Sequence, residues 1–159
     1  MPEMHRGVIR EFLKKCRAEA RQAALEFEEE PPPDERDLDA IFNRLNEAYF
    51  NGKVEAQVEW GKNVKTPNRR SFSFGSYDAG RKLIRIHPRL RQDFVPVFVL
   101  ELTVYHEMCH QAFPPVKRNG QWQTHHKEFK AKEREYKNYR EAMHWEKKHW
   151  VQLMAPVEE

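Results

Sequence analysis

The chain has 159 residues and a net charge of +3, a length that suits one domain with a buried hydrophobic core. No stretch approaches the roughly 20 apolar residues that cross a membrane, and the first residues lack the apolar centre of a secretory signal. The only cysteines, Cys16 and Cys109, exclude a disulfide framework and a Cys-x-x-Cys zinc ribbon. We therefore expect a cytoplasmic protein without membrane contact.

The charges are distributed unevenly along the chain. Residues 1–50 contain 8 basic and 12 acidic side chains, whereas residues 62–91 contain 9 basic ones and the single acid Asp78. The nine are Lys62, Lys65, Arg69, Arg70, Arg81, Lys82, Arg85, Arg89 and Arg91. A local excess of this kind attracts a polyanion, so the segment predicts DNA as a partner. The alternative is a basic surface that faces only solvent.

The beginning of the chain predicts a separate element. Apolar residues recur at helical spacing over roughly residues 4–29, which indicates an amphipathic helix. Three glutamates and then three prolines at 31–33 end this helix and form a short, stiff linker. We expect an N-terminal helix and linker over 1–33 and a second part, with a helical tail, over 34–159. The sequence leaves open whether the first helix covers a site in the second part.

A helix and three short strands begin the second part. The helix has Asp34 or Asp37 as its N-cap and ends at Asn51-Gly52. Alternating residues then predict strands at 54–60, 71–77 and 82–87, with a hairpin at Asp78-Ala79-Gly80. Residues 69–75 would offer an edge with which an extended substrate pairs.

The pattern H-E-x-x-H occurs at residues 106–110. The almost entirely apolar run from Val95 to Tyr105 leads into it, which predicts a buried helix over about 96–113 and argues against two surface histidines on a polar helix. Positions i and i+4 share one face of a helix, so His106 and His110 can bind one zinc ion. Glu107 then lies beside the open side of the metal, where it would deprotonate a water that zinc activates.

The end of the chain must supply a third ligand, because a catalytic zinc site has three protein ligands and one open position. A loop with Asn119-Gly120 leads to Thr124, a candidate N-cap, and helical spacing continues with interruptions to about Met154. The candidate ligands there are His125, His126, Glu128 and Glu133. Adjacent histidines on a helix point about 100° apart, so the two histidines cannot both face one ion. Spacing alone does not choose among the four. The order of helices and strands predicts an α+β fold.

The stretch from Ile41 to Phe129 resembles the SprT-like metallopeptidase domain, which bacterial SprT proteins share with the protease Spartan. The resemblance rests on segments 41–54, 58–62 and 75–90 and on Y-H-E-M-C-H at 105–110. It implies a zincin-like fold, in which a small three-stranded sheet packs on helices. The sequence H-H-K-E-F at 125–129 stands where the family has H-G-P-E-F. This carries the role of third ligand onto His125 and leaves His126, in the family's glycine position, as the alternative.

The resemblance implies a zinc metallopeptidase. His106, His110 and His125 would hold one zinc ion, and Glu107 would act as the general base. The substrates would be proteins or peptides, and members similar to Spartan act on proteins attached to DNA, in the repair of DNA–protein crosslinks. A further donor to the oxyanion is expected, with Tyr77, Tyr105, Tyr136 and Arg85 as candidates.

Two alternatives differ from this hypothesis in what the site does. One is a nucleic-acid-binding module whose metal is structural and cleaves nothing. The other is a peptidase that is indifferent to DNA.

Overall fold

The chain divides into two compact units, Met1–Asp34 and Glu35–Glu159. The structure is a computed structural model, and it describes residues 2–26, 34–62 and 72–155. No helix in these described ranges is both long and apolar enough to span a membrane.

The first unit contains one helix, α1, which covers Pro2–Glu26. It exposes several large apolar side chains, and Phe12 is 65% exposed. The helix predicted over 4–29 is therefore present over the described residues and begins two residues earlier, and residues 27–29 lie outside the described part of the chain. The predicted proline linker at 31–33 lies outside the described residues.

Helix α2 covers Leu38–Phe50 and begins at one of the two predicted caps. The carboxylate of Asp37 accepts hydrogen bonds from the backbone N–H groups of Asp39 at 3.0 Å and Ala40 at 3.4 Å, which have no partner inside the helix. Asn51 then adopts a left-handed φ of 52° and ends the helix, as predicted.

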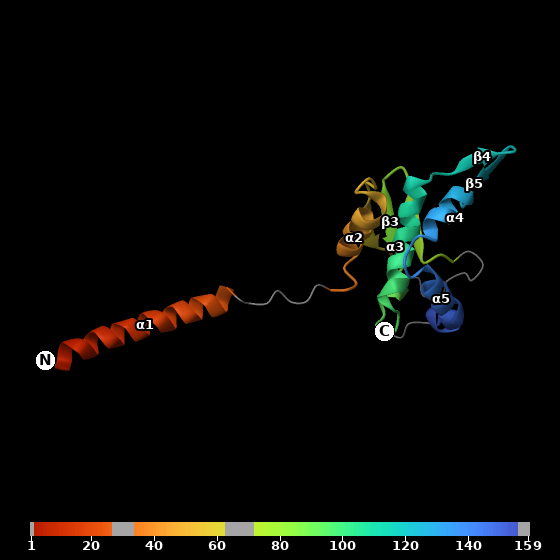
Figure 1. Cartoon of the computed structure of the whole chain (residues 1–159). Helices are drawn as coiled ribbons and strands as arrows, with labels where there is room; N and C mark the ends of the chain where they lie inside the picture. The colour runs from red at the N-terminus through yellow and green to blue at the C-terminus, as the bar shows by residue number, and fades with distance from the viewer. Residues whose placement is uncertain (1, 27–33, 63–71, 156–159) are drawn as a thin grey trace. The chain divides into compact units, whose positions relative to one another are not determined.

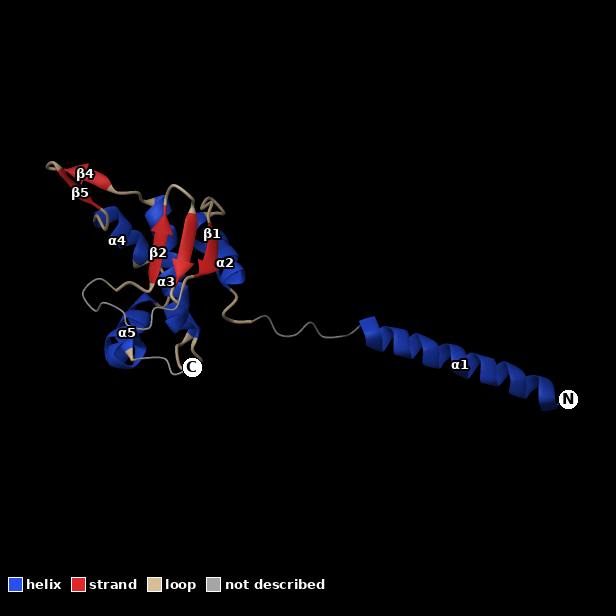
Figure 2. Cartoon of the chain, turned by 180° about the vertical axis from the view of Figure 1, so that it is seen from behind, coloured by secondary structure: helices blue, strands red, loops and turns tan. Residues whose placement is uncertain are grey.

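Three short strands form one mixed sheet in the order β1-β3-β2 (Figure 2). The strands are β1 at Gln57–Trp60, β2 at Gly75–Asp78 and β3 at Leu83–Ile86. β1 runs parallel to β3, and β2 runs antiparallel to it. The fold is thus α+β with a small three-stranded sheet, as predicted, and β2 is an edge strand of that sheet.

Strand β2 begins at Gly75, four residues later than the predicted strand over 71–77. The hydroxyl of Ser73 donates to the carbonyl oxygen of Gly75 at 2.6 Å, and a local bond of this kind competes with strand pairing. The Phe74 ring is buried against Trp150. The edge predicted at 69–75 is therefore shifted to 75–78, and residues 69–71 lie outside the described part of the chain.

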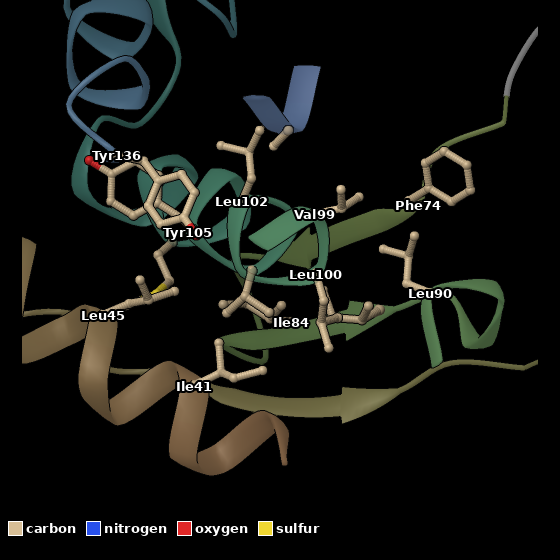
Figure 3. Packing of buried hydrophobic residues seen from close by; sticks show 14 of the residues in the cluster. Ile41, Leu45, Phe74, Ile84, Leu90, Val99, Leu100, Leu102, Tyr105 and Tyr136 are labelled. Carbon is tan, nitrogen blue, oxygen red and sulfur yellow. The ribbon is translucent and has the colours of Figure 1, made fainter. Parts of the chain in front are cut away.

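Helix α3, Val97–Ala112, contacts α2, α4, α5 and the strands β2 and β3 (Figure 1). Its apolar first half packs on α2 and the inner face of the sheet, and Figure 3 shows Ile41, Ile84 and Leu100 in this cluster. Each fully buried aliphatic side chain of this kind contributes roughly 1.5–3 kcal/mol to folding. The buried helix predicted over 96–113 is confirmed.

Four further elements follow α3. They are β4 (Val116–Arg118), β5 (Gln121–Gln123), α4 (Lys127–Glu133) and α5 (Tyr139–Met154). β4 and β5 form a hairpin around Asn119 and Gly120, which both have positive φ. The expectation of a plain loop here is wrong, although Asn-Gly is a strong signal for a two-residue hairpin turn.

The first turn of α4 differs from its prediction in one respect. His126, and not Thr124, is the N-cap, because the His126 side chain accepts a hydrogen bond from the backbone N–H of Phe129. The interruption predicted in the helical tail lies between Glu133 and Tyr139, where the Tyr136 side chain is buried.

Candidate metal centre

The last two turns of α3 carry two histidines on one face. The Nε2 atoms of His106 and His110 lie 3.2 Å apart. The helix ends just after them, because Pro114 and Pro115 follow and proline does not continue a helix. Cys109, between the two histidines, is fully buried and belongs to the hydrophobic core.

His125 reaches the same point from the segment between β5 and α4. Its Nε2 lies 3.4 Å from Nε2 of His110, and one ring nitrogen from each of the three histidines lies within 4.8 Å of the others. Two nitrogen ligands at about 2.0–2.1 Å from a tetrahedral zinc ion lie about 3.3 Å apart. The observed separations of 3.2 and 3.4 Å therefore suit one ion of this size.

Two of these imidazoles are held in the form that binds a metal. Burial, with the charges of His106 and His125, lowers the pKa of His110 to about 4. Burial also lowers the pKa of His125. Both rings are therefore neutral near pH 7, which leaves a nitrogen lone pair for a metal ion.

His126, the alternative to His125, is engaged elsewhere. Its Nε2 lies 3.0 Å from the carbonyl oxygen of Pro114, and its Nδ1 lies 2.9 Å from the carboxylate of Glu128 and 3.4 Å from the backbone nitrogen of Phe129. The side chain is buried at the start of α4. The structure therefore brings His125, and not His126, to the pair on α3. The candidate Glu128 is exposed and pairs with the arginine at the end of β4 at 3.0 Å.

Glu133, the last of the four candidates, contacts the opposite side of one imidazole. Its Oε1 lies 2.7 Å from Nδ1 of His106, whereas Nε2 of that ring faces His110. A carboxylate in this position orients the ring, keeps the proton on Nδ1 and leaves Nε2 for a metal ion. Burial alone would lower the pKa of His106, but the hydrogen bond with Glu133 and the charge of Glu107 raise it.

A single phenyl ring supports all three histidines. Phe129 is fully buried, and its centroid lies 5.1, 4.7 and 4.9 Å from those of His106, His110 and His125. A packed ring at this place restricts the rotamers of the imidazoles. This contact gives a physical reason for the phenylalanine four residues after His125.

Glu107 lies beside the histidines and is only 4% exposed. Its Oε2 is 3.9 Å from Nε2 of His110, and burial raises its pKa to about 7. Gly75 of β2 lies against it, because a Cβ at that position would be 2.7 Å from Oε1 of Glu107. A larger residue here would have to displace the Glu107 carboxylate or move β2 away from it. No local pattern in the sequence indicates this contact.

A further carboxyl group, that of Glu146 on α5, interacts electrostatically with residues of the site. Burial raises the pKa of Glu146, the charge of His106 opposes the rise, and the charge of Glu133 adds to it. Glu146 therefore lies within electrostatic range of both residues. The sequence does not indicate this, because the tail contains several glutamates and no spacing links one of them to the H-E-x-x-H pattern.

A cleft of about 470 Å³ opens beside the histidines. Gly75, Ser76 and Tyr77 of β2 line it, as do Pro114 and Pro115 beyond α3. The edge of the sheet and the three imidazoles thus face one space.

One of the four oxyanion candidates lines this cleft. Tyr77 does so, and its hydroxyl oxygen accepts a hydrogen bond from Nε2 of Gln111 at 3.0 Å, which leaves the hydroxyl proton free to be donated. The other three are committed elsewhere. Tyr105 donates to the carbonyl oxygen of Lys132, Tyr136 to the carboxylate of Glu101, and Arg85 to that of Glu59.

The basic segment 62–91 is less positive at the described surface than its sequence indicates. Arg85 pairs with Glu59 at 2.9 Å and Lys82 with Glu55 at 3.5 Å, and both acids precede the segment in the chain. Arg89 is 1% exposed. Three others, Lys65, Arg69 and Arg70, lie outside the described residues. The described part of the segment therefore does not form the continuous basic face on which the prediction of DNA binding depends.

Comparisons with known proteins agree with this geometry. No curated protein matches the chain. The profile of the SprT-like family matches residues 38–149, which begin with α2 and include Glu107 and the three histidines. Because this match covers well over half of the chain, the chain belongs to the SprT-like family.

Proposed function

We propose that this protein is a zinc-dependent metallopeptidase that hydrolyses peptide bonds with an activated water. The observation that carries the proposal is the convergence of three imidazole nitrogens, with separations of 3.2 and 3.4 Å, beside a buried glutamate in an open cleft. Membership of the SprT-like family supports it. A structural zinc site has four protein ligands, whereas this group contains three among the described residues, which favours catalysis over the structural alternative.

Each residue of the site has its own role in the proposed reaction. His106, His110 and His125 would hold the ion, and three imidazoles with an open fourth position form a donor set of catalytic zinc sites. Bound zinc supplies Lewis acidity, which polarises a carbonyl oxygen and lowers the pKa of water toward ~7. Glu107 accepts the proton of the attacking water and passes it to the leaving amine. Tyr77 donates a hydrogen bond to the developing oxyanion.

The edge strand β2 supports a polypeptide as the substrate. One of its two edges pairs with β3, and its residues Gly75 to Tyr77 line the cleft. An extended peptide can add to the other edge through main-chain hydrogen bonds. That the substrates are proteins attached to DNA stays a prediction from the family resemblance. The described part of segment 62–91 gives this prediction little support, because Arg85 and Lys82 are paired with acidic side chains.

We expect Glu107→Gln to retain zinc and to lose hydrolysis. The amide has the size of the carboxylate but cannot accept a proton, and the loss of a general base lowers turnover by about 10²–10⁴-fold. Zinc content and cleavage of a flexible DNA-binding protein would be measured for this variant, the wild type and Glu47→Gln, an exposed glutamate of α2. Wild-type turnover by Glu107→Gln would remove Glu107 from the role of general base.

The same cleavage assay, run with and without DNA, separates the substrate hypotheses. Faster cleavage with DNA supports proteins attached to DNA, and equal rates support a peptidase that is indifferent to it. Salt-sensitive DNA binding without any cleavage by the wild type would favour the nucleic-acid-binding module with a structural metal.

Glu133→Ala should weaken zinc binding by about 10–100-fold, because His106 loses the partner that orients its ring. The control is Glu135→Ala, since Glu135 is exposed and pairs with Lys132 at 2.8 Å. Competition with a chromophoric chelator measures the affinity of both variants. Equal zinc affinity of Glu133→Ala and the wild type would show that this hydrogen bond does not support the site.

Tyr77→Phe should lower kcat by about 10²–10³-fold with little change in KM, as expected for a donor that acts on the transition state. Tyr139→Phe is the control, because Tyr139 packs against the core outside the cleft. Steady-state cleavage of a fluorogenic peptide gives both constants. An unchanged kcat would exclude the Tyr77 hydroxyl from oxyanion stabilisation.

A further inference from the structure

A second groove, of about 750 Å³, adjoins the cleft beside the histidines. Thr124 and His125 line both spaces, so a chain that crosses His125 passes from one into the other. Helix α4 and the β4–β5 hairpin, which lie side by side in Figures 1 and 2, form the rest of the groove.

Four cationic side chains line this groove. They are Arg118, Lys127, Lys130 and Arg134. Glu128 neutralises Arg118 through two contacts of 3.0 and 3.1 Å. The other three are exposed and form no ion pair among the described residues. They recur along α4 at i, i+3 and i+7, which at 1.5 Å per residue spans about 10 Å.

The cleft on the other side of His125 has a different character. Its described lining contains no lysine or arginine and a single carboxyl group, that of Glu107. The two spaces that meet at His125 therefore differ in charge. A bound polypeptide would experience a neutral environment along β2 and a positive one along α4.

We infer that the groove along α4 binds acidic side chains of the polypeptide substrate, on the side of the scissile bond that extends past His125. This inference rests on the proposed peptidase function and names its substrate class, polypeptides with aspartate or glutamate on that side. An extended chain advances about 3.3 Å per residue, so the 10 Å stripe of cations faces about three substrate residues. Unpaired lysine and arginine side chains at that spacing attract carboxylates.

The groove suits an acidic peptide better than a nucleic acid. Proteins that hold single strands stack bases on aromatic side chains. The pairing of the hairpin puts Trp122 beside Lys117, on the face opposite Arg118 and Gln123, so Trp122 points away from the groove. Proteins that bind a duplex strongly contact about 6–10 phosphates, and three unpaired cations are too few for that.

The test compares binding of two labelled peptides to zinc-loaded Glu107→Gln, which leaves them intact. One peptide contains a block of glutamates and the other an equal block of glutamines. Fluorescence anisotropy should show about tenfold tighter binding of the acidic peptide at low salt, since each exposed ion pair adds a modest amount. Adding Lys130→Glu and Arg134→Glu should abolish or reverse the preference. The control adds Lys53→Glu and Lys148→Glu, which make the same change in net charge at exposed positions outside both spaces.

Three results would overturn the inference. The first is equal affinity for the two peptides, and the second is an equal loss of preference in the control variant. The third is a 20-nucleotide single-stranded DNA that binds more tightly than the acidic peptide and loses its affinity with Lys130→Glu and Arg134→Glu. Failure of the proposed function looks different. A wild type that cleaves nothing while the acidic preference persists contradicts the peptidase but not the groove, and cleavage without a preference contradicts only the groove.

Discussion

The burial of α3 is the constraint on which the site depends. Its first half contributes fully buried side chains, among them Leu100, to the core between α2 and the sheet. Its last two turns carry His106, Glu107 and His110, so these polar side chains are fixed to a helix that packs against α2, α4, α5 and the sheet. A site on a packed helix holds its geometry better than one on a loop. The two imidazoles need no rearrangement to meet one ion.

The third histidine, His125, lies just before α4 and not on α3. Its position therefore depends on contacts that hold α4 against α3. The hydroxyl of Tyr105 donates to the carbonyl oxygen of Lys132 at 2.6 Å, and the side chain of His126 bonds to the carbonyl oxygen of Pro114. Phe129 fills the space between the helices under the imidazoles. These contacts tie both ends of α4 to α3. They explain why the residue beside His125 is itself a histidine, although it does not join the group.

The sequence predicted those parts of the site that lie close together in the chain. The spacing of His106 and His110 follows from helix geometry, and the family pattern identified His125. Contacts between residues that are far apart in the chain left no local pattern in the sequence. The closeness of Gly75 to Glu107 and the electrostatic interaction of Glu146 with His106 depend on how β2 and α5 pack, and no residue spacing in the sequence indicates either. The ion pairs of Arg85 and Lys82 in segment 62–91 left no local pattern either, because their acidic partners lie on β1 and just before it, and DNA binding by this segment stays a prediction.

The proposed peptidase requires that three imidazoles of this chain hold one zinc ion with an open position. X-ray absorption spectroscopy of the zinc-loaded protein tests this requirement most directly. We predict one zinc per chain, with three histidine nitrogens at about 2.0–2.1 Å and one oxygen ligand, and the loss of one nitrogen in His125→Ala but not in His126→Ala. A sulfur ligand, a fourth histidine, or the loss of a nitrogen only in His126→Ala would contradict it.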